Sequence, residues 1–137
     1  MAGAPRPTSS SRRRQPGLLI VDDDRLIRWS LKEALRKDYR LWVSENAEKS
    51  LALLPRLKQL DAVISDVRLP GMDGVEFLRK VRKERPGVKI FLMTAFDLDR
   101  GPRRAFSIRA DGYLSKPFEL STVRDMLASH LSGPRLW

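Results

Sequence analysis

Short apolar runs alternate along the chain with longer stretches in which apolar residues recur every three or four positions. The short runs predict strands that are buried on both faces, and the longer stretches predict amphipathic helices. The predicted strands are residues 18–21, 41–43, 62–64, 88–93 and 112–115. The predicted helices are residues 24–37, 46–54, 75–85 and 120–131, with one more short helix beginning at or after Pro102. This repeated alternation indicates an α/β fold, a five-stranded parallel sheet with helices on both faces.

The 137 residues suit a single domain, which we expect over residues 17–132. Residues 1–16 hold mostly Arg, Ser and Pro with almost nothing to bury, so they predict a disordered basic tail, and residues 133–137 predict a short C-terminal tail. No apolar run approaches the roughly 20 residues that cross a bilayer, and the chain has no cysteine. We therefore expect a cytoplasmic protein without membrane insertion.

The net charge of +10 is compatible with nucleic acid, a membrane surface or an acidic protein as partner. The basic residues are scattered along the chain and no recognition motif accompanies them, so we do not expect nucleic-acid binding. An arm for nucleic acid in the Arg-rich tail stays open as an alternative, and its affinity would fall steeply with salt. The stretch between the fourth and fifth predicted strands is basic through Arg100, Arg103, Arg104 and Arg109.

Polar residues stand at the ends of four predicted strands. Three aspartates, residues 22–24, follow the first strand, and Asp66 follows the third. Thr94 follows the fourth strand and Lys116 the fifth. The carboxyl ends of parallel strands meet at one edge of the sheet, where ligands bind in open α/β folds. We therefore expect these side chains to converge.

A cluster of this composition is suited to a phosphoryl group. Neighbouring carboxylates repel one another unless a cation lies between them, and an all-oxygen ligand set favours Mg²⁺ or Mn²⁺. The cation and Lys116 would neutralise phosphoryl oxygens, while a carboxylate can serve as the nucleophile and form an acyl phosphate. Asp66, at the end of the central strand, is the best placed for attack.

Four motifs together resemble the receiver domains of two-component response regulators, over about residues 17–132. The resemblance implies the flavodoxin-like, doubly wound fold of the chemotaxis regulators, with strand order 2-1-3-4-5. The first segment, VDDDRLIRWSLKEAL, is similar to receivers of the nitrogen-regulator type. The motifs are VDDD at 21–24, SDVRLPGMDG at 65–74, FLMTA at 91–95 and DGYLSKPF at 111–118.

The resemblance implies a phosphoacceptor and a metal site. Asp66 would accept the phosphoryl group. Asp22 and Asp23, together with Asp66 and the backbone carbonyl of Arg68, would hold Mg²⁺. Lys116 would pair first with Asp66 and then with the phosphoryl group.

The resemblance also implies a conformational switch. Thr94 would bond a phosphoryl oxygen, and the ring of Tyr113 would enter the space that Thr94 leaves. The surface made by the fourth helix in chain order (the one after Pro102), the fifth strand and the fifth helix would then change shape and bind its target differently. Pro117 would follow a cis peptide bond.

We accordingly expect a single-domain response regulator, since the chain ends about six residues after the last predicted helix. A histidine kinase or phosphotransfer protein would phosphorylate it, and it would signal to a protein partner through the face from the fourth to the fifth helix. It would be a phosphoryl acceptor with Mg²⁺-dependent self-phosphorylation and slow self-dephosphorylation, not a turnover enzyme. It would act as a monomer or a phosphorylation-linked dimer.

Two alternatives belong to other functional classes. A phosphorylation-independent adaptor would keep the fold and act through the basic fourth-helix surface or the tail, and function that persists in Asp66→Ala would favour it. A Mg²⁺-dependent phosphohydrolase with an aspartyl nucleophile usually carries a second acid two residues later, and that position is Arg68 here.

Other polar and aromatic residues have simpler interpretations. Asp24 is placed to cap the first helix. Asp73 is expected to be a turn residue, with Gly74 at a position that needs unusual backbone angles. Trp29 and Trp42 are expected to pack against the first helix and the second strand.

Overall fold

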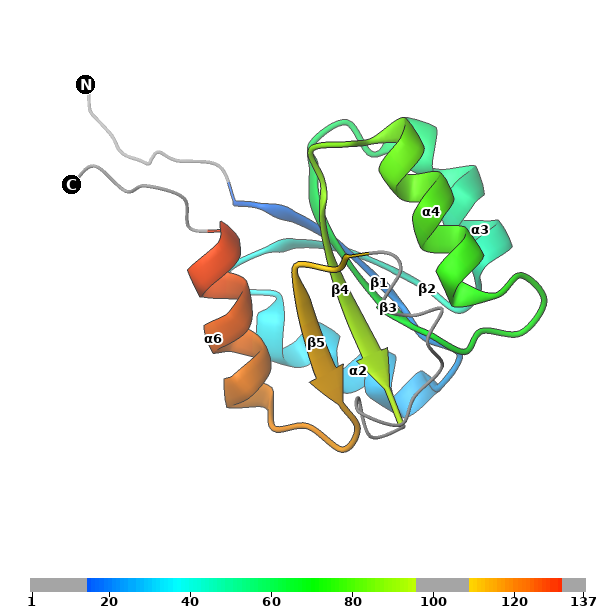
Figure 1. The fold of residues 1–137 in the computed structure, drawn as a ribbon. Helices are drawn as coiled ribbons and strands as arrows, with labels where there is room; N and C mark the ends of the chain where they lie inside the picture. The colour runs from blue at the N-terminus through cyan, green and yellow to red at the C-terminus, as the bar shows by residue number, and fades with distance from the viewer. Residues whose placement is uncertain (1–14, 96–108, 132–137) are drawn as a thin grey trace, which may run out of the picture.

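A computed structural model describes residues 15–95 and 109–131 of the chain. Five parallel strands form one sheet in the order β2-β1-β3-β4-β5, so the expected fold class and strand order are confirmed (Figure 1). The strands are β1 (Gly17–Val21), β2 (Arg40–Ser44), β3 (Leu60–Asp66), β4 (Lys89–Thr94) and β5 (Gly112–Ser115).

Helices lie on both faces of the sheet. In Figure 1, α3 and α4 lie on one side of the sheet, and α2 and α6 lie on the other. Within the described ranges, no helix is long and apolar enough to span a bilayer. The helices are α2 (Arg25–Leu35), α3 (Ala47–Leu53), α4 (Gly74–Glu84) and α6 (Leu120–Leu131), and the short 3-10 helix η1 (Leu54–Arg56) follows α3.

Each predicted strand is present, as are four of the predicted helices, with small shifts at their ends. Three expectations fall outside the described residues. These are the helix after Pro102, the basic stretch around it except for Arg109, and both terminal tails except for Gln15 and Pro16. The division of the chain into a tail, a domain and a second tail therefore stays a prediction.

The sheet separates two apolar cores because both of its faces are covered. Successive side chains of a strand point to opposite faces, and the central strand β3 shows the result. Val63 is buried in the cluster beneath α3 and α4. Its neighbours Ala62 and Ile64 are buried in the cluster beneath α2 and α6. This double burial fixes β3 rigidly, and with it the residue that ends the strand.

The turn from β3 into α4 differs from expectation in one detail. Asp73 caps α4, since its carboxylate accepts a hydrogen bond of 2.7 Å from the backbone N–H of Val75. Gly74 does not need unusual backbone angles; among the glycines that the structure describes, the one with a positive φ, +77°, is Gly71. Gly74 is required for space instead, because a Cβ there would lie 2.4 Å from the carbonyl oxygen of Asp66.

The two tryptophans differ in environment. Trp42 on β2 is half-buried and packs against the core beneath α3, with the guanidinium of Arg40 over its ring at 5.5 Å. Trp29 is 59% exposed, so its expected packing role is wrong. The buried face of α2 carries Leu31 and Leu35. Trp29 precedes Leu31 by two positions and therefore points to another side of the helix.

Replacing Gly74 with Ala tests this close approach. The added methyl group would collide with the carbonyl oxygens of Asp66 and Val67, so we expect the free energy of unfolding to fall by about 1–3 kcal/mol. Gly87→Ala is the matched control, because a Cβ there meets no atom within 4 Å. Urea denaturation of both variants measures the difference. Equal stability of the two variants would contradict the close-approach explanation.

Candidate functional site

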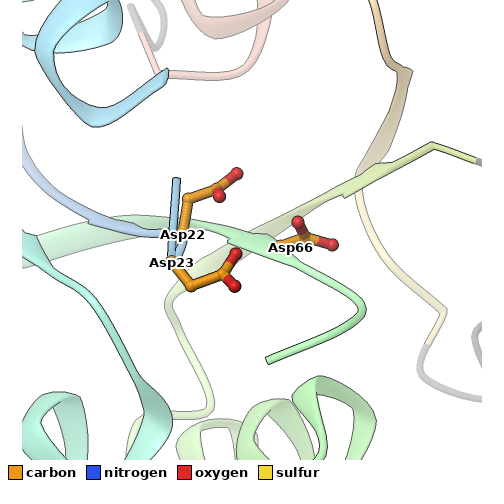
Figure 2. A group of neighbouring side chains, drawn as sticks. All are labelled: Asp22, Asp23 and Asp66. Carbon is orange, nitrogen blue, oxygen red and sulfur yellow. The ribbon is translucent and has the colours of Figure 1, made fainter. Parts of the chain in front are cut away.

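The polar ends of the strands meet at one edge of the sheet. Val21 at the end of β1 pairs with Ser65 of β3, so Asp22 and Asp66 follow paired positions on neighbouring strands. Asp23 comes next on the β1 side, and the three carboxylates lie close together (Figure 2). The predicted convergence of these acids is therefore seen in the structure.

The acid cluster has the chemistry of a site for a hard divalent cation. Asp22, Asp23 and Asp66 each offer one carboxylate oxygen, and these oxygens lie within 4.8 Å of one another. Asp22 and Asp66 are buried while Asp23 is exposed, so one side of the cluster is open to solvent. Oxygen donors of this kind suit Mg²⁺, which takes one or two carboxylates and keeps several waters. The residues present therefore fit a magnesium ion.

Lys116 joins two of the three acids. Its ammonium donates hydrogen bonds to Asp22 at 2.7 Å and to Asp66 at 2.5 Å. The Lys116 side chain is only 15% exposed, so these charge-assisted bonds are partly shielded from water. The peptide bond from Lys116 to Pro117 is cis, as expected. The lysine thus supplies the positive charge between the buried carboxylates.

The pKa values of this group reflect burial and mutual charge. Burial raises the pKa of Asp22 above its ordinary value, although the hydrogen bonds from Lys116 and from the N–H of Asp24 oppose this rise. Burial by itself would lower the pKa of Lys116, but its hydrogen bonds to Asp22 and Asp66 raise it above the ordinary value. Lys116 is therefore held in its charged form, and the charged form of Asp22 is costly.

The remaining predicted residues lie near this edge with separate contacts. Thr94 ends β4 and is 4% exposed, and its carbonyl oxygen accepts a 2.7 Å hydrogen bond from the N–H of Lys116. The N–H of Arg68 donates to Asp66 at 2.9 Å. Tyr113 pairs with Leu92 on β4, two positions before Thr94, and it is half-buried against the core beneath α3 and α4.

Two further contacts steady the site, and the sequence did not indicate them. Arg28 of α2 donates a 2.7 Å hydrogen bond to the backbone carbonyl of Asp22. Glu48 of α3 accepts a 2.9 Å hydrogen bond from the N–H of Met72, in the loop that follows Asp66. A charged residue on an amphipathic helix is ordinarily solvated, so only the packing of the helices reveals these two roles.

The fold and the site together define a class of protein. The sequence model of the response regulator receiver domain matches residues 18–128. The chain therefore belongs to the family of response regulator receiver domains, which are phosphoryl acceptors of two-component systems. Receiver domains interact with histidine kinases or phosphotransfer proteins, and they bind Mg²⁺ through acidic residues.

Particular relatives are similar over most of the chain. The DNA-binding transcriptional regulator NtrC of Salmonella typhimurium is 39% identical over 74% of the chain, which spans only 22% of NtrC. Sporulation initiation phosphotransferase F of Bacillus subtilis is 30% identical, with 83% of the chain and 92% of that protein covered. The chemotaxis response regulator CheY4 of Vibrio cholerae superimposes with a TM-score of 0.77 at 27% identity, covering 86% of the chain and all of CheY4.

Replacing Asp22 with Asn tests the cost of its buried charge. The pKa of Asp22 lies above its ordinary value of 3.8, so the folded protein binds this proton more tightly than the unfolded chain does. In metal-free buffer the wild type should therefore lose stability relative to Asp22→Asn as the pH rises through that raised pKa, by about 1.4 kcal/mol for each pKa unit. Towards pH about 4 the two curves should converge.

The measurement is urea denaturation with a chelator across the range from about pH 4 to pH 8. Asp23→Asn is the matched control, since it removes one charge of the same cluster from an exposed position. A stability difference between wild type and Asp22→Asn that does not change with pH would contradict this account of the site.

Proposed function

We propose that Asp66 accepts a phosphoryl group from a histidine kinase or phosphotransfer protein, and that the domain passes the signal to a protein target. The observation that carries this proposal is the pair of hydrogen bonds from Lys116 to Asp22 and Asp66, beside a third carboxylate. This arrangement offers one nucleophile, one fixed cation and the ligands of a second cation within a single edge of the sheet.

Asp66 is suited to act as the nucleophile because its carboxylate is held on both oxygens. Oδ1 accepts the N–H of Arg68 and Oδ2 accepts Lys116. In the transfer, a carboxylate oxygen of Asp66 attacks phosphorus, the bond from phosphorus to the donor atom breaks, and the donor leaves with that electron pair. Positioning supplies much of the rate of such a reaction, since the carboxylate needs no reorganisation before attack.

Charge neutralisation supplies the rest of the rate of phosphoryl transfer. Asp22, Asp23 and Asp66 would hold Mg²⁺ together with the backbone carbonyl of Arg68. The ion supplies positive charge to the phosphoryl oxygens and lowers the repulsion between them and the carboxylates. Lys116 would then exchange its hydrogen bond to Asp66 for one to a phosphoryl oxygen, which keeps its ammonium paired throughout the transfer.

The signal would travel from β4 to β5. Thr94 is buried at the end of β4, and its carbonyl already bonds the N–H of Lys116. A hydroxyl hydrogen bond from Thr94 to the phosphoryl group would favour one of two packings in which the half-buried ring of Tyr113 lies differently. The expected output face is made by the predicted helix after Pro102, by β5 and by α6. That helix lies outside the described residues, so β5 and α6 are the described part of the face.

Incubation with Mg²⁺ and acetyl phosphate tests the acceptor. We expect the intact mass to rise by one phosphoryl group in the wild type and not at all in Asp66→Asn or in chelator. Asp23→Asn should slow the labelling about tenfold or more, because it weakens the charge stabilisation of the transferring group. Asp125→Asn, an exposed acid on α6, is the matched control and should be labelled like the wild type.

Labelling that persists in Asp66→Asn would mean that another residue accepts the phosphoryl group, and it would contradict the proposal. An absence of labelling in the wild type, combined with function that survives Asp66→Ala, would instead support the phosphorylation-independent adaptor. The basic segment and the tail on which that adaptor would depend fall outside the described residues.

Replacing Thr94 tests the switch separately from the acceptor. Beryllofluoride, a stable mimic of the phosphoryl group, should still bind at Asp66 in Thr94→Ala. The lost hydrogen bond to a charged group is worth about 1.5–3 kcal/mol, enough to change the ratio of the two packings about tenfold or more. Amide NMR shifts at Tyr113 and Leu114 report the ratio. Thr94→Ser keeps the hydroxyl and should retain the shifts, so equal loss in both variants would contradict a role for this hydrogen bond.

A further inference from the structure

The open edge of the sheet at β2 carries a cavity of about 600 Å³, separate from the acid cluster. Arg28 lines it from α2, while Lys49 lines it from α3 and Arg56 from η1. The helix α2 packs in the core on one face of the sheet, and α3 and η1 pack in the core on the other. The cavity therefore crosses the edge of the sheet and does not lie on one face alone.

The backbone of β2 offers hydrogen-bonding groups at this edge. The carbonyl of Ser44 accepts from Asp22, and the N–H of Arg40 donates to Pro16, so these residues turn their main-chain groups towards the β1 side. Main-chain groups of successive strand residues point to opposite sides. Val43 therefore turns its N–H and C=O away from β1. In the described sheet β2 has a neighbouring strand on one side only, and Val43, 38% exposed, lines the cavity.

The charge of the cavity is positive. Three cationic side chains and one acid, Glu45, line it, and Glu45 already forms an ion pair with Lys49. The hydrogen bond and charge of Lys49, and more weakly the charge of Arg28, lower the pKa of Glu45, which is thus kept ionised and paired. Arg28 and Arg56 remain to attract an anionic occupant, and the apolar part of the lining includes Val43 and Leu53.

We propose that this edge is a docking site for an extended acidic peptide segment of a partner protein, which pairs with β2 as an added strand. Such a segment would satisfy the outward main-chain groups of Val43 and place the carboxylates of alternate residues on the α3 side of the sheet, beside Arg56. A small anion would use the cations but leave the strand edge unpaired, and unpaired edges are the usual template for strand addition. The site is independent of phosphorylation at Asp66.

A dye-labelled peptide of alternating Glu and Val, acetylated and amidated at its ends, serves as the probe in fluorescence anisotropy with the full chain. We expect saturable binding at low salt. The double variant Lys49→Glu/Arg56→Glu should weaken it about tenfold or more. The control Arg36→Glu/Lys83→Glu makes the same change in net charge at exposed positions that do not line the cavity. It should stay within about threefold of wild type.

Two modified peptides test the strand pairing itself. One carries N-methyl groups on all Val residues and the other on all Glu residues, so that only one of them loses the N–H groups that face β2. We expect one of the two to bind about tenfold more weakly than the other. Hydrogen exchange at the amide of Val43 should slow when the unmodified peptide binds. Thermal unfolding of each protein variant confirms that the variants are folded.

Several outcomes would overturn the proposal. Equal loss of peptide affinity in the two double variants would show that the loss comes from net charge alone and not from the cavity. Equal affinity of the two methylated peptides, or equally tight binding of N-acetylglutamate at the same carboxylate concentration, would indicate a small-anion site. The absence of saturable binding by the unmodified peptide would remove the docking site altogether. Binding retained in Asp66→Asn keeps this test separate from that of the phosphoacceptor.

Discussion

The structure depends on the balance of charge between carboxylates that the sheet brings together and the one lysine placed among them. Asp22 and Asp66 are buried at the ends of neighbouring strands, where the loss of water makes the charge of Asp22 costly and their mutual repulsion adds to that cost. Lys116 reduces that repulsion through hydrogen bonds to both acids. Asp22, Asp23 and Asp66 carry more negative charge than Lys116 balances, which suits this group to a hard divalent cation.

The same imbalance of charge has a cost in stability. A group of buried acids costs folding energy that the two apolar cores must offset, and such strain at a functional site is common in natural proteins. The contacts that hold the acids come from several elements. Arg28 bonds the backbone of Asp22, Glu48 holds the loop after Asp66, and Gly74 lets that loop approach the strand closely. The site therefore depends on the helices as much as on the strand ends.

The acid cluster and the cavity beside β2 carry charge of opposite sign and lie on different parts of the sheet. The acid cluster at the carboxyl edge suits cations and a phosphoryl group, while the cavity beside β2 is lined by Arg28, Lys49 and Arg56. Arg28 contributes to the acid cluster and to the cavity, since its guanidinium bonds the carbonyl of Asp22 and also lines the cavity. An occupant of the cavity would thus contact a residue that also bonds the backbone of the acid cluster.

The sequence by itself determined the alternation of strands and helices, the parallel sheet and the acids at its carboxyl edge. These follow from local periodicity and from the rule that parallel strands end together. Only the tertiary structure decided that Lys116 also bonds Asp22, 94 residues away, and that Glu48 holds the loop at Met72. It also decided that Trp29 is exposed and that Gly74 is needed for space. Such contacts depend on how the helices pack over the sheet, and a local pattern carries no information about the neighbour that packing brings.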